Sequence, residues 1–211
     1  MNVNKQADPE VITIMRQTDE ALELAKDNQG IITAEMADRA GISRGILKHL
    51  VEKGALNHPS RGFYSLPEAW EDEFVALQNR YKRGIFSLET ALYLLDLTDR
   101  TPVRFHMTFP LTYNLTGPKQ EGVACNSAID SVYGMGVVAL KTPSGNLVRA
   151  YNAERTLCDI LKTRNHMDIQ IVSDAFRRYF RGNGINIPLL SEYARRLRVA
   201  ERLQAYLEVL E

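Results

Sequence analysis

The stretch TAEMADRAGISRGILKHLVEKG, residues 33–54, contains two helix starts close together. Thr33 and Ser43 are residue types that cap the first turn of a helix, because a side-chain oxygen accepts a hydrogen bond from a free backbone N–H. They predict one helix over residues 33–40 and a second over residues 44–53. Two short helices joined by a tight turn predict a helix-turn-helix, a unit that commonly places its second helix in the major groove of DNA.

The small and apolar residues of this stretch match what a helix-turn-helix needs. A small residue is expected where the helices cross, a glycine at the turn, and apolar residues that lock the second helix in place. The residues at these positions are Ala37, Gly41, Ile42, Leu47 and Leu50. The alternative interpretation is a helical hairpin that belongs to a general core.

The second helix is expected to turn one face inward and one face outward. Its inward, apolar arc consists of Ile46, Leu47, Leu50 and Val51. Its outward arc consists of Gly45, Lys48, His49 and Glu52. Gly45 removes bulk from this outward face, which would let the helix lie close to a groove.

The segments on either side of the helix pair complete a small domain. Residues 55–66 predict two short extended pieces around a turn rich in proline, serine and glycine, and such a hairpin directly after a helix-turn-helix is a wing. A helix over residues 8–27 precedes the pair. The sequence PEAWEDEFVALQNRYKR, residues 67–83, predicts a connecting helix.

Six side chains are predicted to bind DNA, and they are Thr33, Ser43, Arg44, Lys48, His49 and Arg61. Arg44 is placed for a guanine edge or a phosphate, and the flexible point charge of Lys48 favours a phosphate. Thr33, at a helix N-terminus, is a predicted phosphate ligand. Arg61, at the wing tip, would reach the adjacent backbone or minor groove. The alternative for each residue is a solvated surface position.

Beyond residue 83 the pattern becomes a mixture of helices and strands. Helices are predicted over residues 87–96, 153–164, 168–182 and 188–209. Strands are predicted over residues 103–109, 136–141 and 147–151. The expected fold class is α+β, with an N-terminal winged helix-turn-helix domain in residues 1–66, a linker helix in residues 67–83 and a larger mixed α/β C-terminal domain in residues 84–211.

Composition excludes some classes of protein. The 211 residues carry 26 basic and 26 acidic side chains, so a nucleic-acid surface must come from local clustering of charge. No apolar run approaches the roughly 18–20 residues of a membrane span, and the N-terminus has no secretory pattern. We therefore expect a cytoplasmic protein that does not bind a membrane. Cys125 and Cys158 match no metal spacing and are not expected to form a disulfide.

The C-terminal part contains two rows of arginine that form a possible secondary surface for nucleic acid or a partner. The first row consists of Arg177, Arg178 and Arg181, and the second of Arg195, Arg198 and Arg202. These rows could hold DNA backbone, RNA or an acidic partner, or could be ordinary solvated helix faces. Arg155 and Asp159, one helical turn apart, predict a local ion pair.

The sequence contains no recognisable catalytic or metal-binding motif. His106 and His166 have no second ligand at metal spacing. Cys158 lies among apolar residues of a predicted helix and is expected to be a buried thiol. We therefore expect no catalytic residues, no metal, no cofactor and no enzymatic activity, although catalytic groups can also assemble from distant residues.

Two further stretches, SLETALYLLDLTDRTP at residues 87–102 and YNAERTLCDILK at residues 151–162, give the chain a family resemblance. Together with the predicted winged start they resemble the AbiEi-type antitoxins, which are the antitoxin halves of bacterial type IV toxin–antitoxin pairs linked to abortive phage infection. The chain departs from the pattern of this family at Leu88, where histidine is frequent, and at Leu95-Asp96, where His-Gly is common.

The resemblance implies a specific function. Such proteins use the winged domain to bind inverted repeats in their own promoter and so repress the operon. Their C-terminal domain neutralises a nucleotidyltransferase-like toxin, without the need for a stable complex. A single winged domain covers one half-site, so an inverted repeat needs two copies, either a weak dimer or monomers that pair on DNA.

Two other readings remain open at this point. The first is a winged-helix transcription factor whose C-terminal domain senses a small molecule, which a pocket with a few convergent polar groups would favour. The second is an enzyme with a DNA-tethering domain, which a tight cluster of titratable residues in a cleft would favour.

Overall fold

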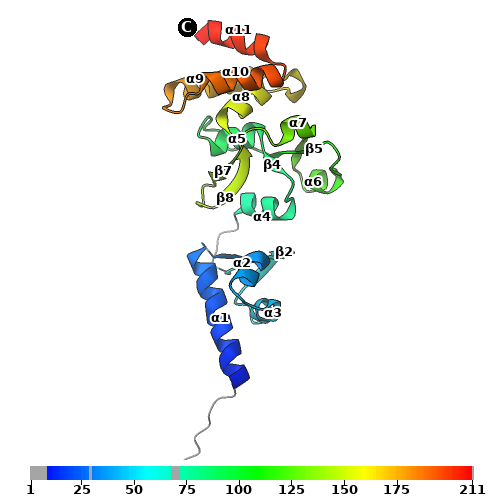
Figure 1. The fold of residues 1–211 in the computed structure, drawn as a ribbon, viewed down its shortest axis with the longest axis vertical. Coiled ribbons are helices and arrows are strands. Elements are labelled where there is room, and N and C mark those ends of the chain that lie inside the picture. The colour runs from blue at the N-terminus through cyan, green and yellow to red at the C-terminus, as the bar shows by residue number, and fades with distance from the viewer. Residues whose placement is uncertain (1–8, 29, 68–71, 211) are drawn as a thin grey trace, which may run out of the picture. The chain divides into compact units, whose positions relative to one another are not determined.

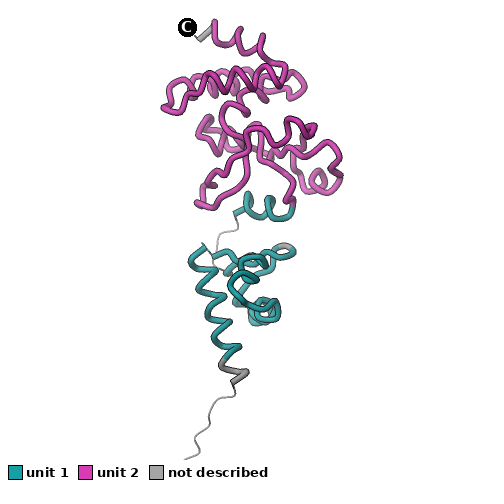
Figure 2. Tube along the Cα trace, viewed as in Figure 1, with its two compact units in different colours: residues 1–80 teal, residues 81–211 magenta. Residues whose placement is uncertain are grey.

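The computed structural model describes residues 9–28, 30–67 and 72–210. The chain divides into two compact units, residues 1–80 and residues 81–211 (Figure 2). This division lies between the predicted end of the N-terminal domain at residue 66 and the predicted end of the linker helix at residue 83.

The first unit consists of helices and a small antiparallel sheet (Figure 1). Its elements in chain order are α1 (Pro9–Asp27), β1 (Ile31–Thr33), α2 (Ala34–Arg39), α3 (Arg44–Glu52), β2 (Asn57–Ser60), β3 (Phe63–Ser65) and α4 (Glu73–Arg80). The sheet has the order β1-β3-β2, and β3 pairs antiparallel with both neighbours. The predicted helices over residues 8–27, 33–40 and 44–53 correspond to α1, α2 and α3, and the predicted hairpin corresponds to β2 and β3.

A compact core holds these elements together. Leu47 is fully buried on α3, and Ala37 is fully buried on α2 at the predicted crossing. Over residues 13–27 of α1 the buried residues are the small Ala21 and Ala25, which let that helix lie close to α3 and β1. Gly41 adopts a φ of 73°, a left-handed conformation that L side chains avoid, so the turn between α2 and α3 depends on glycine.

The predicted linker helix over residues 67–83 is wrong in length. Helix α4 covers only Glu73–Arg80, and residues 68–71 of the prediction lie outside the described residues. The side chain of Asp72 explains why α4 begins at Glu73. Its Oδ1 accepts hydrogen bonds from the backbone N–H of Phe74 at 3.0 Å and of Val75 at 3.3 Å. A buried carboxylate therefore caps this helix.

The second unit is a five-stranded mixed sheet with helices around it (Figure 1). Its strands are β4 (Ile85–Phe86), β5 (His106–Pro110), β6 (Ala124–Ala128), β7 (Val137–Lys141) and β8 (Leu147–Tyr151). Its helices are α5 (Leu88–Leu94), α6 (Thr116–Gln120), α7 (Asp130–Tyr133), α8 (Ala153–Ile160), a 3-10 turn (Thr163–Asn165), α9 (Ile169–Arg181), α10 (Ile187–Arg196) and α11 (Ala200–Leu210). The strand order is β6-β5-β4-β8-β7, with β5/β6 and β4/β8 parallel and the other two pairs antiparallel.

Two sequence predictions in this unit need correction. The predicted strand over residues 103–109 begins only at His106, and Val103 is 97% exposed. The predicted helix over residues 188–209 is two helices, because Arg198 adopts a left-handed φ of 59° between α10 and α11. The N–H of Val199 bonds to the carbonyl of Ala194 at 2.9 Å, the closure typical of a Schellman helix end.

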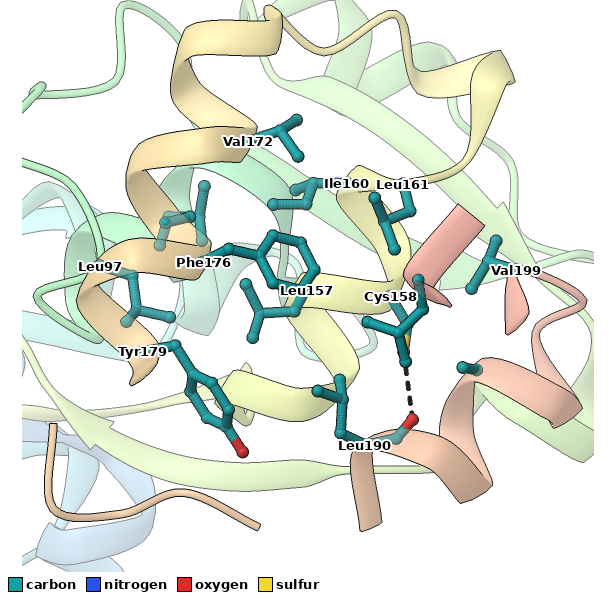
Figure 3. Packing of buried hydrophobic residues seen from close by; sticks show 14 of the residues in the cluster. Leu97, Leu157, Cys158, Ile160, Leu161, Val172, Phe176, Tyr179, Leu190 and Val199 are labelled. Carbon is teal, nitrogen blue, oxygen red and sulfur yellow. Dashed lines mark hydrogen bonds between the residues drawn. The ribbon is translucent and has the colours of Figure 1, made fainter. Parts of the chain in front are cut away.

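The core of the second unit lies where α8 packs between α9 and α10 (Figure 3). Leu157 and Cys158 of α8 are fully buried, as is Phe176 of α9. The Cys158 thiol donates a hydrogen bond to the carbonyl of Leu190 on α10, with a sulfur–oxygen distance of 3.7 Å. Burial raises the pKa of Cys158 to about 12, so the thiol stays protonated, as expected for a structural cysteine.

We predict that Leu157→Ala lowers the free energy of unfolding by about 2–5 kcal/mol, because it leaves a cavity in this core. The matched control is Leu147→Ala on β8, since Leu147 is 65% exposed, and its effect should stay within about 0.5 kcal/mol. Urea denaturation followed by circular dichroism measures both. Equal losses for the two variants would contradict the placement of Leu157.

Candidate nucleic-acid interface

Helix α3 presents two different faces. Ile46, Leu47 and Leu50 are 6%, 0% and 3% exposed, so they anchor the helix to the core of the first unit. Val51, the fourth residue of the predicted apolar arc, is half-buried. The residues predicted to point outward, Gly45, Lys48, His49 and Glu52, are all exposed. The predicted faces of this helix are therefore confirmed.

Thr33 and Ser43 both act as helix caps. The hydroxyl of Thr33 accepts a hydrogen bond from the backbone N–H of Met36 at 3.1 Å, at the start of α2. The hydroxyl of Ser43 accepts one from the N–H of Ile46 at 3.4 Å, at the start of α3. Each hydroxyl keeps its own proton for donation, so capping does not compete with donation to a phosphate oxygen.

Arg44 and Lys48 are exposed and each pairs with a nearby carboxylate. The Arg44 guanidinium lies 3.2 Å from Asp38, and the Lys48 ammonium lies 3.7 Å from Glu52. The side chains of Arg44 and Lys48 are 75% and 80% exposed, so both pairs are well solvated. Such surface pairs contribute little, and a phosphate group can replace the carboxylate.

The hairpin places Arg61 beside the start of α2. Arg61 is exposed in the turn between β2 and β3, next to Gly62, whose φ is 75°. The carbonyl of Gly62 accepts a hydrogen bond from the N–H of Ala34 at 2.8 Å. Arg61 and Thr33 therefore belong to neighbouring parts of the first unit.

A stacked ring pair on the hairpin is a feature that sequence reasoning missed. The rings of His58 on β2 and Tyr64 on β3 lie 4.7 Å apart, with an interplanar angle of 24°. No signal in the sequence predicted this pair, because His58 fell within the predicted turn, whereas the structure places it on β2. Stacking stiffens the hairpin that carries Arg61.

The six arginines of the predicted secondary surface do not form two uniform rows. On α9, Arg178 pairs with Asp99 and Arg177 lies 3.7 Å from Asp174, whereas Arg181 is exposed at the end of the helix. The second predicted row is wrong as a helical row, since the helix ends before Arg198. Arg195 lies on α10, Arg198 lies between the helices, and Arg202 lies on α11.

The ion pair predicted between Arg155 and Asp159 is present but deeply buried. Arg155 Nε lies 2.9 Å from Asp159 Oδ2, and the two side chains are 2% and 7% exposed. Lys162 Nζ lies 2.5 Å from the other oxygen of the same carboxylate. The Arg155 guanidinium also donates to the carbonyls of Val132 and Met135, which lie within and just after α7. The Arg155–Asp159 pair therefore stabilises the second unit from its interior.

Glu154, beside this pair, forms a second buried polar contact. The hydroxyl of Tyr179 lies 2.9 Å from Glu154 Oε1 and accepts a hydrogen bond from the N–H of Asn186 at 2.7 Å. Burial raises the pKa of Tyr179 to about 12, and the Glu154 carboxylate adds to this shift. The Tyr179 hydroxyl thus keeps its proton and donates it to Glu154, which links α9 to α8 and to the start of α10.

Within the described residues, no group of three or more histidine, cysteine, aspartate or glutamate side chains lies in a metal-binding arrangement. His106 lies on β5 as predicted, and burial lowers its pKa against the opposing effect of Glu89. None of the helices, over the ranges that the structure describes, is long and apolar enough to cross a membrane.

We predict that Ser43→Ala lowers the free energy of unfolding by about 0.5–2 kcal/mol, since it removes the cap of α3. Lys48→Ala, on the exposed face of the same helix, should change it by less than about 0.5 kcal/mol. Thermal and urea unfolding of the full chain compare the two variants. A loss for Lys48→Ala as large as that for Ser43→Ala would mean that Lys48 supports the fold.

Comparison with known proteins found a family match for part of the first unit. Residues 19–67, which contain α2, α3 and the hairpin, match the family model described as a transcriptional regulator, AbiEi antitoxin. One similar solved structure is the crystal structure of the RV2827C protein from Mycobacterium tuberculosis, with 16% sequence identity and a TM-score of 0.46 over 93% of this chain and 81% of that chain. No curated protein matches the sequence. Residues 19–67 thus resemble an AbiEi antitoxin transcriptional regulator, which confirms the predicted resemblance.

Proposed function

We propose that α2, α3 and the β2–β3 hairpin form a winged helix-turn-helix that binds inverted repeats in the promoter of the chain's own operon. We further propose that the chain is the antitoxin of a type IV pair and that residues 81–211 neutralise a nucleotidyltransferase-like toxin without a stable complex. In this proposal the protein acts in the cytoplasm, needs no cofactor and is not an enzyme.

The observation that carries the DNA-binding part is the outward face of α3. Three buried side chains hold the helix while Lys48, His49 and the start of the helix at Arg44 remain exposed. This is the arrangement that a recognition helix needs, since its N-terminal residues contact base edges and phosphates. Arg61, on the neighbouring hairpin, supports a second contact with the DNA backbone or minor groove.

Gly45 gives independent support for a close approach at this face. A Cβ added at Gly45 would meet only the Ser43 hydroxyl oxygen, at the ordinary contact distance of 3.7 Å. The fold therefore does not require glycine here, although glycine within a helix is less stable than alanine by roughly 0.5–1 kcal/mol. A partner that lies directly against α3 explains why the side chain is missing.

The antitoxin part of the proposal is supported by the family match over residues 19–67 and by the motifs at residues 87–102 and 151–162. The second motif contains the buried Arg155–Asp159 pair, so its residues support the second unit from within. For the inverted repeat, we propose that two monomers pair on DNA, one on each half-site.

The central prediction concerns Arg44→Ala combined with Lys48→Ala. This variant should lose binding to a fragment from upstream of the gene in a gel-shift titration, keep its circular dichroism spectrum, and still protect cells that express the toxin. The matched control is Arg16→Ala with Lys26→Ala, which removes the same charge from exposed positions on α1 and should bind normally. Unchanged affinity of the first variant would remove the recognition-helix assignment, and loss of protection would contradict separate roles for the two units.

A second prediction uses the fold's tolerance at Gly45. Gly45→Ala should stabilise the first unit by roughly 0.5–1 kcal/mol, and Gly45→Gln should fold normally, but both should bind the operator more weakly, the glutamine variant most. Melting temperature and gel-shift affinity are measured on the same samples. If Gly45→Gln binds as tightly as the unmodified chain, no partner approaches α3 at this position.

A further inference from the structure

A hollow in the second unit lies where two parallel strands end. Leu111 directly follows β5, and Ser127 and Ala128 end β6, its parallel neighbour. The cavity volume is about 750 Å³, and the other walls are formed by Ile129, Ser131, Val132, residues 162–164, residues 196–199 and Arg202. The carboxyl ends of parallel strands are a frequent place for small ligands, and this volume lies within the range of ligand pockets.

The charge of this hollow has one sign. The basic side chains that line it are Lys162, Arg164, Arg196, Arg198 and Arg202. Among the described residues that line it, none is acidic. By contrast, exposed faces of α9 and α10 carry both arginine and acidic side chains. A concave surface lined only by cations therefore concentrates positive potential.

Nearby carboxylates compensate only part of this charge. Asp159 is shared by Lys162 and the buried Arg155, so one carboxylate serves two cations. Glu192 lies 3.7 Å from Arg196. Burial lowers the pKa of Lys162, Asp159 opposes this shift, and the positive charges of Arg155 and Arg164 add to it. An anion in the hollow would relieve this repulsion.

Two of the basic side chains are unpaired. Arg164 and Arg198 are exposed and form neither an ion pair nor a side-chain hydrogen bond with the part of the chain that the structure describes. By contrast, Arg202 donates to the carbonyl of Leu161 at 2.9 Å, which holds its guanidinium at the wall. The hollow thus combines fixed and free cations.

Arg198 is also strained. It occupies the left-handed position at the end of α10, with a φ of 59°, where glycine is the usual residue. A side chain in this conformation costs about 1 kcal/mol or more, and such strain tends to persist where the residue has another role. An arginine in this strained conformation, lining a cationic hollow, suggests a ligand for its guanidinium.

The uncharged residues of the lining suggest which anion fits. Ser127, Ser131 and Thr163 supply hydroxyls that can donate to phosphate oxygens. The apolar residues of the lining, such as Ile129 and Val199, are aliphatic. The described lining contains no aromatic ring on which exposed bases could stack. Recognition through a short chain of phosphates fits this surface better than recognition through the bases of a single strand.

We propose that this hollow binds a small polyphosphate anion, either a nucleoside triphosphate or an inorganic polyphosphate chain. The phosphates lie against Arg164, Arg198 and Arg202, with hydroxyl donors from Ser127 and Thr163. In a nucleoside triphosphate the sugar and base lie on the aliphatic wall. This inference is independent of DNA binding by α3.

Isothermal titration calorimetry on the full chain tests the proposal, with ATP, sodium tripolyphosphate, AMP and inorganic phosphate as probes. ATP or tripolyphosphate, or both, should bind saturably with one site per chain, and AMP and phosphate should bind at least about tenfold more weakly because they offer fewer charge-assisted hydrogen bonds. Tighter binding of ATP than of tripolyphosphate identifies a nucleotide ligand. Equal affinities identify the phosphate chain as the recognised group.

Arg164→Ala combined with Arg198→Gly is the decisive variant. It should weaken tripolyphosphate binding by about tenfold or more and should not lower the melting temperature, because glycine relieves the left-handed strain at residue 198. The matched control is Arg177→Ala with Arg195→Ala, which removes two exposed arginines outside the hollow and should leave the affinity unchanged.

Three results would overturn the proposal. The first is no saturable binding of either polyphosphate. The second is equal weakening by the control variant, which would indicate general attraction of anions by the surface. The third is that a 20-nucleotide single strand or duplex binds through Arg164 and Arg198 and that neither ATP nor tripolyphosphate competes with it. That result would make the hollow a nucleic-acid surface.

Discussion

The second unit depends on one constraint, which is that the buried guanidinium of Arg155 must be balanced by an opposite charge and by hydrogen-bond acceptors. Arg155 lies in the interior, where a charge without partners would be very unfavourable, so every group around it must be placed to satisfy it. Asp159 supplies the opposite charge, and backbone carbonyls from the α7 region accept hydrogen bonds. The centre of the Tyr151 ring lies 4.2 Å from the guanidinium carbon. Gly136 completes the arrangement, because an added Cβ there would approach Arg155 Cβ to 2.8 Å. One side chain therefore fixes how α8 meets α7 and the start of β7.

The first unit uses a different principle, since its exposed face is positioned by apolar burial and by helix caps. Leu47 and its buried neighbours determine how α3 rotates about its axis, and Ser43 determines where the helix begins. The rotation of α3 and its starting residue together place the side chains of Arg44 and Lys48 in solvent. The proposed DNA contacts thus depend on residues that would never touch DNA.

Helices α2 and α3 of the first unit could be predicted because local chemistry determines them. The features that the sequence did not predict depend on contacts between residues far apart in the chain. Thr33 and Ser43 act on amides three residues away, so the boundaries of α2 and α3 follow from the sequence alone. Strands β4 and β6 were not predicted, because β4 has two residues and β6 is the weakly patterned ACNSA. The spacing of Arg155 and Asp159 predicted their ion pair, but a one-turn spacing does not indicate whether such a pair is buried. The arginine at residue 198 gave no sign of a helix end, because that signal is normally glycine. The assignment of DNA contacts stays a prediction.

The break at Arg198 also affects how the end of the chain moves. A continuous helix would share one hydrogen-bond ladder, whereas two helices joined by a left-handed residue can open separately. Helix α11 is held by the buried Leu203 and by stacking of Tyr206 on Phe176, with ring centroids 5.4 Å apart. Its amides should therefore exchange with solvent hydrogen faster than those of α10, which packs on α8. Since Arg202 lies on α11, each such opening also removes one wall of the cationic hollow, so access to that hollow is linked to the local stability of the last helix.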